Sequence, residues 1–597
     1  MAGLDFAFFQ LLYKMLSHQT GSISRVDFHP QKPRFEGREI PMQFPRTSPE
    51  AQGISSDHIR EYLQTLAGSQ ASSPHHSMIM RHGNVISECS FFPYERGIWH
   101  ITHSLCKSVT GMAVGFAVDE GILSLDEKIL DIFSRHAGVF SHIRRGGLTV
   151  EDLLNMTSGV DFSEAGAISG NTWRAGYMNA PQKFEAGSQF EYNSMNSYML
   201  SAAIQEKTGL TMMEYLRPRL FEPLGIDEIF WERCPQGVTK GGWGMFIKPE
   251  DALKLGYLYL HGGSWKGRQI IPRSWVEAST AKHSDGGAFG YGYQLWMDER
   301  PGSFAFNGLF GQDVVVDPDI DMVYMVNAGS RELFQTGELT SIMRYYWGGH
   351  YRPSDTPLPE DPEAYARLIQ LERNLMDGIW KPAQEKHEGF WIYPAQSHSF
   401  RTEDLIRQLS GRSYRMEQGT IGLFPLICQV MHNNFTEGIS RIGFEEDDGT
   451  LAVLFREGES TQKIRISFGG EKYISQIDLR GEPYLVSMTG RITTDEMDRI
   501  ALVLELYYME ESCSRVFHMF FSGKDLELRA TEKPGDKVIM EALDYTGGGS
   551  LMENRIIRRI IPQGTENIMD ESLYFTVHPT DIGHVEEGGS QMLLEEK

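Results

Sequence analysis

The spacing of apolar residues changes near residue 385, and this change constrains the fold more than any other feature. From about residue 46 to 350, helical patterns alternate with short β-like runs such as SFAFNGLFGQDVVVD and MVYMVNAG. Beyond about residue 385, short alternating runs such as GTLAVLFRE and QKIRISFGG recur between Gly, Asp and Lys turn signals. Such alternation is typical of an antiparallel sheet that curls into a barrel or sandwich. The sequence therefore predicts a mixed helical and β region followed by an all-β region.

Composition shifts divide the chain further. The chain has 597 residues, which is more than one hydrophobic core usually accommodates, so two or three domains are expected. The stretch YRPSDTPLPEDPEAY, rich in proline and acidic residues, indicates a linker that leads into the helical segment PEAYARLIQLERNLM. The predicted segments are an N-terminal leader (1–45), a mixed domain (46–350), the linker with its helix (351–384) and a β-rich domain with an acidic tail (385–597).

The N-terminal residues MAGLDFAFFQLLYKML are apolar but make a poor signal peptide. Asp5 comes early, no basic residues precede the apolar run, and Gln10 and Lys14 interrupt it. The run is also too short to span a bilayer, so no transmembrane segment is expected. If this segment is an amphipathic helix, we expect it to pack on its own domain or on a sister chain in preference to a membrane surface. Packing on a sister chain would make the protein a homo-oligomer.

Net charge and cysteine usage limit the partners and the compartment. A formal net charge of −24, without a clustered block of Lys and Arg, argues against nucleic acid and disfavours anionic membrane surfaces. No two of the five scattered cysteines have the spacing of a zinc site. A disulfide framework is not expected in so large a chain, so the sequence favours a reducing compartment and a cytoplasmic location.

A serine lies three residues before a lysine three times, at Ser104 with Lys107, Ser279 with Lys282, and Ser460 with Lys463. The third pair lies between strand-like runs, where side chains three residues apart point to opposite faces of a sheet. The second pair follows the helical segment PRSWVEAS and precedes a turn. Neither context favours contact between the hydroxyl and the amine.

The first pair begins an apolar helical stripe that ends at Asp119-Glu120-Gly121. Thr102 is the predicted N-cap, which puts Ser104 in the first turn and Lys107 one turn later on the same face. The helix dipole favours negative charge at the serine oxygen, and a partly buried lysine loses pKa and can accept a proton. These are the requirements for activating a serine without histidine. The alternative is that Ser104 is a second cap and Lys107 a surface lysine.

Seven segments carry a family resemblance in order: SPEAQGISSDHIREYL, MIMRHGNVISE, HSLCKSVTGMAVGFAVDEGILSLDEKI, LTVEDLLNMTSGV, GSQFEYNSMNSYMLSAAIQEKTGLTMMEYLRPRLFEPLGI, GMFIKPEDALKLGYLYLHGGSWKGRQIIPRSWV and FGYGYQLWM. Together they resemble the serine β-lactamase and penicillin-binding-protein superfamily, nearest to class C β-lactamases and their esterase relatives. The resemblance spans roughly residues 46 to 345. It implies an α+β fold, in which an antiparallel sheet flanked by helices and an all-helical part precede the barrel-like β domain.

The resemblance also implies roles for single residues. Ser104 would be the nucleophile, Lys107 its partner and Tyr192 the phenol of the second motif, and which of Lys107 and Tyr192 is the base stays open. The backbone N–H groups of Ser104 and Leu309 would form the oxyanion hole. The implied substrate-binding residues are Trp173, Asn193, Ser194, Phe306, Asn307 and Gly308.

Two motif positions depart from the family. Ser194 stands where asparagine is usual. Asn193 and Asn196 flank it and are candidate substitutes, although a helix turns by about 100° per residue. Phe306 stands where a lysine or histidine usually helps to hold a substrate carboxylate. This loss favours an uncharged acyl group, for which Phe306 would offer apolar surface. The predicted activity is hydrolysis of small, neutral esters or amides through an acyl-enzyme.

No rival chemistry is visible in the sequence. It contains no Gly-x-Ser-x-Gly elbow, no His-Glu-x-x-His and no phosphate-binding glycine loop. No metal or cofactor is expected, and Cys106 inside the first motif is expected to be a small core residue. The alternatives are a β-lactamase or D-amino-acid peptidase, a sensor that acylates once, and a catalytically silent homologue.

Overall fold

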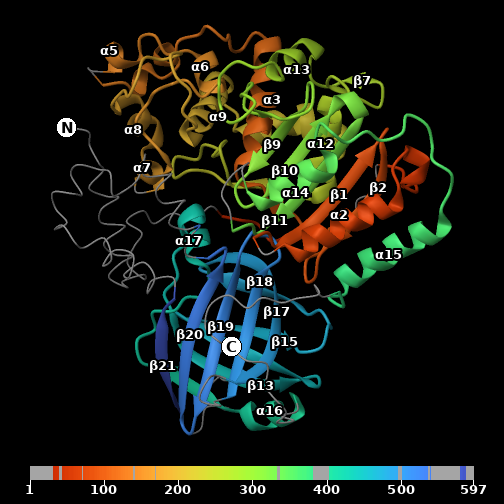
Figure 1. Ribbon diagram of the computed structural model, residues 1–597. Coiled ribbons are helices and arrows are strands. Elements are labelled where there is room, and N and C mark those ends of the chain that lie inside the picture. Colours follow the sequence, from red (N-terminus) through yellow and green to blue (C-terminus); the bar gives the residue numbers. More distant parts are fainter. Residues whose placement is uncertain are drawn as a thin grey trace, which may run out of the picture. The chain divides into compact units, whose positions relative to one another are not determined.

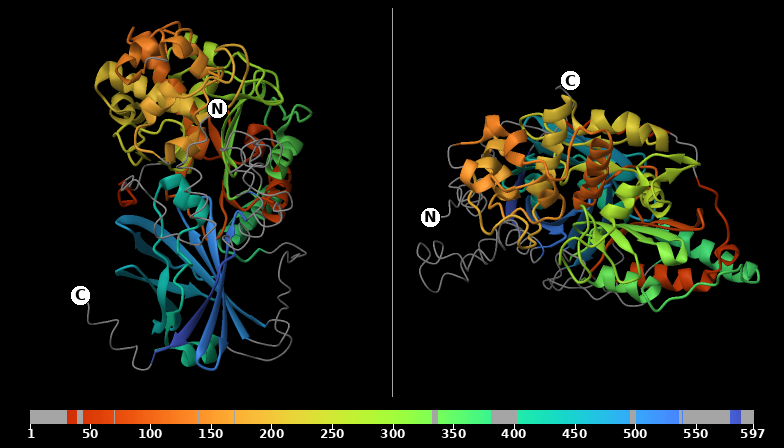
Figure 2. Two further views of the ribbon diagram at one scale, coloured as in Figure 1. Left: turned by 90° about the vertical axis from the view of Figure 1, so that its left-hand side faces the viewer. Right: turned by 90° about the horizontal axis from the view of Figure 1, so that it is seen from above.

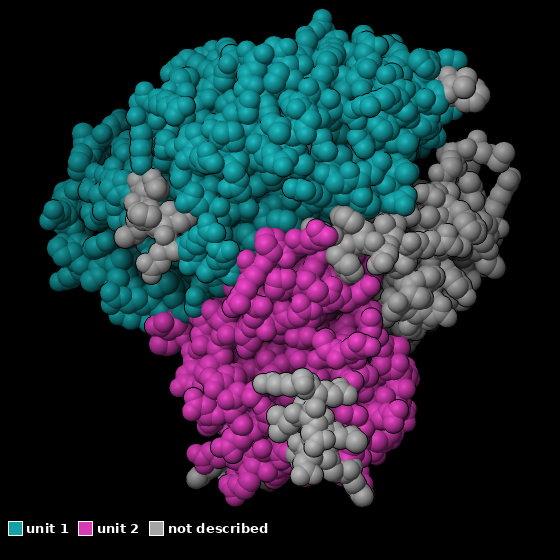
Figure 3. Space-filling view, turned by 180° about the vertical axis from the view of Figure 1, so that it is seen from behind, with its two compact units in different colours: residues 1–8, 35–376, 542–549 teal, residues 9–34, 377–541, 550–597 magenta. Residues whose placement is uncertain are grey.

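The computed structural model describes residues 31–38, 44–331 apart from 70, 139–140 and 169, then 337–380, 402–494, 500–535, 538 and 578–586. The chain forms two compact units, one built mainly on residues 35–376 and the other mainly on residues 377–541 (Figure 3). The expected N-terminal helix (1–16) lies outside the described residues. So does most of the expected tail (584–597), whose first two residues instead end the strand Thr580–Val585. Within the described part of the chain, no helix has the length and apolarity needed to cross a bilayer.

An antiparallel sheet of six strands is the centre of the first unit, counted over its described residues (Figure 1). Residues along a strand alternate between the two faces, so each strand contributes to two layers. The strand order is β2 (Asn84–Ser90), β1 (Pro74–Arg81), β11 (Met322–Ala328), β10 (Gln312–Asp317), β9 (Phe304–Gly308) and β8 (Trp296–Met297).

Helices cover both faces of this sheet (Figures 1 and 2). On one face, α12 (Pro249–Leu260) approaches β10 closely at Gly256, where an added Cβ would lie 2.7 Å from the Val314 side chain. On the other face lie α2 (Ser56–Gly68), α14 (Glu338–Trp347) and α15 (Pro362–Met376). The helix expected in the linker is thus α15, whose Glu372 accepts a 2.6 Å hydrogen bond from Ser87 of β2. It packs within the first unit.

A helical lobe completes the first unit around α3 (Cys106–Asp119) and α9 (Ser194–Thr208). Capping boxes, Thr149 with Asp152 and Thr211 with Glu214, set the starts of α6 and α10. The other helices of this unit are α4 (Ile129–Ile132), α5 (Ser141–Arg145), α6 (Val150–Leu154), α7 (Glu164–Ile168), α8 (Trp173–Asn179), α10 (Met212–Leu216), α11 (Glu222–Leu224) and α13 (Arg273–Ser279). Its short strands are β3 (His100–Ile101), β4 (Phe230–Trp231), β5 (Met245–Ile247), β6 (Ser264–Trp265) and β7 (Arg268–Gln269).

In the described part of the second unit, nine strands close into a barrel (Figure 2). Neighbouring strands are antiparallel except where β15 pairs in parallel with β17 at Ile466 and Met488, which closes the ring. The rings of Phe455 and Phe517, on the non-neighbouring strands β14 and β19, have centroids 5.2 Å apart, so side chains fill the interior. This confirms the barrel-like domain that the alternating runs predict.

The barrel strands are β12 (Ser413–Met416), β13 (Ile439–Asp447), β14 (Thr450–Glu457), β15 (Ser460–Ser467), β17 (Glu482–Thr494), β18 (Ile500–Tyr508), β19 (Ser514–Ser522), β20 (Asp525–Lys533) and β21 (Thr580–Val585). A further strand, β16 (Ile474–Leu479), pairs with β17 outside the ring. The unit also contains α16 (Thr402–Leu409) and α17 (Leu426–His432).

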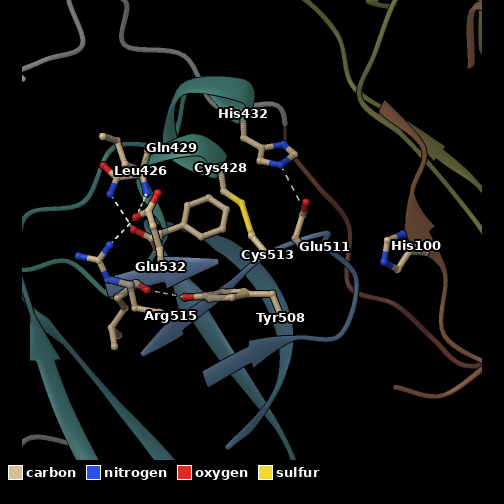
Figure 4. Close-up of a disulfide and its surroundings, with 12 residues drawn as sticks. His100, Leu426, Cys428, Gln429, His432, Tyr508, Glu511, Cys513, Arg515 and Glu532 are labelled. Carbon is tan, nitrogen blue, oxygen red and sulfur yellow. Dashed lines mark hydrogen bonds and ion pairs between the residues drawn. A yellow bond between two sulfur atoms is a disulfide. The ribbon is translucent and has the colours of Figure 1, made fainter. Parts of the chain in front are cut away.

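Buried polar groups and a disulfide hold α17 on the barrel (Figure 4). The Leu426 N–H donates to the Glu532 carboxylate over 2.9 Å, and Arg515 donates to the same carboxylate. Cys428 of α17 is bonded to Cys513, which precedes β19. The sequence does not predict this single disulfide, because 85 residues separate two positions that barrel closure brings together. The other cysteines, Cys89, Cys106 and Cys234, are free and buried.

Candidate active site

Ser104 and Lys107 meet where α3 begins. Ser104 lies in a 3₁₀ turn, His103–Leu105, that runs directly into α3. The Lys107 Nζ donates to the Ser104 Oγ over 2.7 Å and to the Gly242 carbonyl over 2.7 Å. Lys107 is 1% exposed, whereas Ser104 is half-buried. The hydroxyl is therefore the part of this pair that a substrate can reach.

The start of α3 differs from the expected N-cap. Thr102 makes no side-chain cap, because its hydroxyl donates instead to the Met245 carbonyl of β5 over 2.9 Å. The turn is thus anchored on the neighbouring strand. Cys106, the next residue in the motif, is fully buried, as expected of a small core residue, and burial raises the pKa of its thiol to about 12.

Burial prepares Lys107 to accept a proton. Loss of solvation lowers the pKa of its amine from 10.5 to about 8. At pH 7 roughly a tenth of the amines are then neutral, compared with fewer than about one in a thousand for an ordinary lysine. A neutral amine 2.7 Å from a serine hydroxyl can act as a general base.

Tyr192, two residues before α9, faces the same two groups. Its ring centroid lies 4.8 Å from the Lys107 Nζ, and its hydroxyl shares a hydrogen bond with the Ser104 side chain. Burial raises the pKa of the phenol well above its usual 10. The phenol therefore keeps its proton at neutral pH and can donate it, so the three side chains together can move a proton from the serine to a leaving group.

The other two Ser-x-x-Lys pairs are arranged differently. Ser279 is fully buried in α13 and donates to the Val276 carbonyl over 3.1 Å, whereas Lys282 forms an exposed ion pair with Asp285. Ser460 lies on β15, where its hydroxyl and the Lys463 amine contact different neighbours. Of the three pairs, the first has its hydroxyl and amine in contact.

The end of β9 reaches the turn that carries Ser104. A Cβ at Gly308 would lie 2.2 Å from the Thr102 carbonyl oxygen and 3.1 Å from the Leu105 nitrogen, so only glycine allows this approach. Leu309, the predicted second oxyanion donor, is the next residue and is half-buried. The third motif thus lies against the turn that carries Ser104.

The two side chains before Gly308 are engaged by other residues of the first unit. Phe306 is 0% exposed, and its ring centroid lies 5.4 Å from that of Tyr259 on α12. This burial corrects the expectation that Phe306 offers surface to an acyl group, because β9 turns its side chain into the core. Asn307 points to the opposite face of the strand and donates to the buried Asp313 of β10.

The residues around Tyr192 serve mainly to hold α9. Asn193 caps this helix by accepting from the Met195 N–H over 2.9 Å, and its amide donates to two backbone carbonyls. Ser194 is the first helical residue and is 4% exposed. Asn196 is fully buried and accepts a 2.8 Å hydrogen bond from the Tyr177 hydroxyl. The flanking asparagines are thus engaged by the protein itself.

Phe190, Tyr192 and Trp296 form an aromatic wall, and of these residues sequence reasoning missed Phe190 and Trp296. All three side chains are half-buried. The Trp296 ring stacks on Tyr192 with centroids 5.3 Å apart, and the Phe190 centroid lies 5.9 Å from that of Trp296. Trp173, which was expected to line the site, is 4% exposed and stacks instead on Trp243 at 5.5 Å. The signal for Trp296 was its place in FGYGYQLWM, next to the strand of the third motif.

Part of this chain is similar to known proteins. Residues 78–337 match the family model named Beta-lactamase. The chain is 26% identical over 284 residues to the 6-aminohexanoate-dimer hydrolase of Paenarthrobacter ureafaciens, covering 41% of this chain and 70% of that protein.

Two solved structures are also similar. A Bacillus anthracis protein assigned as a 6-aminohexanoate-dimer hydrolase has 18% identity and a TM-score of 0.44, covering 56% of this chain and 92% of its own. EstCE1, a hydrolase with promiscuous acyltransferase activity, has 15% identity and a TM-score of 0.42, covering 49% of this chain and 99% of its own.

Proposed function

We propose that this chain, whose residues 78–337 match the family model named Beta-lactamase, is a serine hydrolase that cleaves ester or amide bonds of small neutral substrates through an acyl-enzyme on Ser104. The observation that carries the proposal is the 2.7 Å contact between the Lys107 Nζ and the Ser104 Oγ, with Tyr192 on the same oxygen. The three groups belong to three different chain positions yet meet at one hydroxyl.

The proposed reaction begins with proton transfer. Neutral Lys107 takes the proton of Ser104 as its oxygen attacks the substrate carbonyl carbon, and the N–H groups of Ser104 and Leu309 face the oxyanion. Tyr192 gives its proton to the leaving group and recovers one from the protonated Lys107. Water then attacks the acyl group with the same residues in reverse, which releases the acid and restores Ser104.

The proposed substrates are neutral acyl compounds. No basic side chain stands at the Phe306 position to hold a carboxylate. The aromatic wall of Phe190, Tyr192 and Trp296 takes over the apolar surface first expected of Phe306, and burying an acyl chain there is worth about 1.5–3 kcal/mol. A linear amide is included because the Paenarthrobacter relative is named as hydrolysing the 6-aminohexanoate dimer.

Hydrolysis of p-nitrophenyl butyrate, nitrocefin and a linear 6-aminohexanoate amide tests the proposal, with the parent and Ser104→Ala side by side. The ester should exceed nitrocefin at least about tenfold in kcat/KM, and Ser104→Ala should be silent on all three. A parent that prefers nitrocefin would make the protein a β-lactamase. A single burst without turnover would indicate a sensor, and silence of the parent would indicate an inactive homologue.

The cellular location and the oligomeric state of the protein can each be tested directly. The disulfide of Cys428 with Cys513 stands against the cytoplasmic location expected from the scattered cysteines, because such bonds are rare in reducing compartments. Cell fractionation, together with a count of free thiols on the purified protein, distinguishes a cytoplasmic location from an oxidising compartment. Light scattering of the full chain tests the proposed homo-oligomer.

A further inference from the structure

Residues 239–245 form a loop whose backbone carbonyls hold the nucleophile helix, and we call it the carbonyl bracket. The Gly241 oxygen accepts from the Thr110 hydroxyl over 2.6 Å, and the Gly242 oxygen accepts from the Lys107 Nζ over 2.7 Å. The carbonyl of Met245 accepts from the Thr102 hydroxyl, as described above. The Cys106 thiol also donates to the Gly241 oxygen. Three carbonyls of the bracket therefore contact α3 and the residue before its preceding turn, and one of these contacts is with the proposed base.

Two glycines let the bracket fit between α3 and α9. Gly241 has a φ of 68°, which favours glycine. An added Cβ at Gly241 would lie 2.7 Å from the Ser197 carbonyl oxygen, and one at Gly242 would lie 2.7 Å from that of Ser194. No side chain can enter here, so the position of these carbonyls is set by residues on either side of the glycines.

A buried ion pair fixes the residue before these glycines. The Lys240 Nζ lies 2.5 Å from the Glu232 carboxylate, and the two side chains are 3% and 1% exposed. The Lys240 N–H also donates to the Glu232 carbonyl over 2.9 Å, and the Gly242 N–H donates to the Lys240 carbonyl over 2.7 Å. Side chain and backbone of Lys240 thus tie the turn that presents the Gly242 oxygen to Lys107.

We propose that Glu232 and Lys240 are positioning residues that orient Lys107 by fixing the carbonyl bracket. A neutral amine has two N–H groups and one lone pair. With one N–H held by the Gly242 oxygen, rotation about the end of the side chain is restricted, and the lone pair can be directed at the Ser104 hydroxyl. This inference rests on the proposed function, in which Lys107 must receive the serine proton.

The pair also places two opposite charges in the loop that contacts the proposed base. Glu232 and Lys240 together carry no net charge, and the Glu232 charge acts on Cys106, the neighbour of Lys107. Replacing Lys240 by a neutral residue leaves the pair with a net negative charge, which favours protonated Lys107. Replacing Glu232 by a neutral residue leaves it with a net positive charge, which disfavours protonated Lys107. The other titratable or charged groups that act on Lys107 or lie over it are Cys106, Glu164 and Tyr192.

Paired variants test the proposal through the pH profile of kcat, measured per active site titrated with a fluorophosphonate so that unfolded molecules do not count. Lys240→Met and Glu232→Gln should each lower kcat roughly tenfold to a hundredfold, because the base is misplaced. Lys240→Met should move the midpoint of the profile up, and Glu232→Gln should move it down.

The matched control is Lys254→Met in α12. Lys254 forms an equally buried pair with Asp251 over 2.6 Å, at 1% and 3% exposure, and its amine also donates to a backbone carbonyl. This variant loses a buried ion pair of the same kind but should keep the parent midpoint. Lys240→Arg retains the charge and should lower kcat without moving the midpoint, which provides a measurement even where Lys240→Met does not fold.

The outcomes separate this inference from the function on which it rests. Midpoints in Lys240→Met and Glu232→Gln that match those of Lys254→Met would overturn the positioning role while leaving the serine mechanism intact. A Lys240→Arg midpoint that shifts as far as Lys240→Met would also contradict it. Turnover that survives in Ser104→Ala would instead overturn the proposed function itself.

Discussion

Two pairs with the same sequence spacing, one in each unit, have opposite arrangements. Ser104 and Lys107 lie at the start of a helix with Oγ and Nζ 2.7 Å apart. On β15 of the barrel, Ser460 donates to the Glu457 carbonyl over 3.2 Å, while Lys463 forms ion pairs with carboxylates of β13. Residues three apart share a helix face but lie on opposite faces of a strand. The periodicity of the backbone therefore decides whether a serine and a lysine at this spacing can come into contact.

The surroundings separate the two lysines further. Lys107 is 1% exposed, whereas the Lys463 side chain is 46% exposed. Burial lowers the pKa of Lys107 to about 8, while hydrogen bonding to Glu445 raises the pKa of Lys463. The first lysine can serve as a base near neutral pH, and the second stays a charged surface group.

The largest expected effect is loss of the proton partners in the first unit. Lys107→Met and Tyr192→Phe should each lower the acylation rate roughly a hundredfold or more, because each removes general acid–base help. The losses should not add in the double variant, since the two groups act on one proton path. Stopped-flow acylation with p-nitrophenyl butyrate measures both. A Tyr192→Phe enzyme as fast as the parent would show that the Tyr192 side chain has only a packing role.

The next effect concerns the barrel alone. Glu532→Gln weakens the charged hydrogen bonds that Arg515 and the Leu426 N–H make with this buried carboxylate. The barrel should lose about 1.5–3 kcal/mol of unfolding free energy. Denaturant unfolding measures this loss, and kcat/KM under native conditions should stay unchanged. Activity that falls in step with barrel stability would show that the two units do not work separately.

A smaller effect follows from the pH dependence of the base. Below its pKa of about 8, Lys107 is mostly protonated and cannot accept the serine proton, and above it the amine is mostly neutral. The acylation rate should therefore rise with pH, by roughly tenfold between pH 7 and 9. Rates measured on a neutral ester across this range test the sign. A rate that is flat or falls would assign the proton transfer to another group.

The smallest effect is expected from the lysine of the barrel pair. Lys463→Ala removes half-exposed ion pairs, which contribute only about 0.2–1 kcal/mol, and turnover should be unchanged. Comparing its unfolding curve and kcat with those of Lys107→Met completes the contrast between the two pairs. A large loss of activity in Lys463→Ala would mean that the barrel takes part in the reaction.

The parts of this structure that depend on local period could be predicted from the sequence. The helical stripe after Ser104 predicts its contact with Lys107, and the alternating runs beyond residue 385 predict the barrel. Directions and pairings set by tertiary contact could not be predicted. Thr102 donates to Met245 instead of capping α3, and β9 turns Phe306 into the core.

Long-range pairs were equally hidden from sequence reasoning. The bond between Cys428 and Cys513 joins positions 85 residues apart, and no local pattern reports such proximity. Glu232 and Lys240 are close in sequence, but an acid and a lysine eight residues apart carry no recognisable pattern. Their proposed role follows only from the structure, in which the Gly242 carbonyl of the bracket contacts the Lys107 amine.

We propose that Ser104 and Lys107 carry out the reaction and that Ser460 and Lys463 take no part in it. Mapping the covalently modified serine tests this most directly. The full-length parent is treated with a fluorophosphonate, digested, and its labelled peptides are identified by mass spectrometry, with Ser104→Ala treated in parallel. We predict one adduct, on Ser104, with Ser279 and Ser460 unmodified and no labelling of Ser104→Ala. Modification of Ser460 or Ser279, or labelling that persists in Ser104→Ala, would contradict the account.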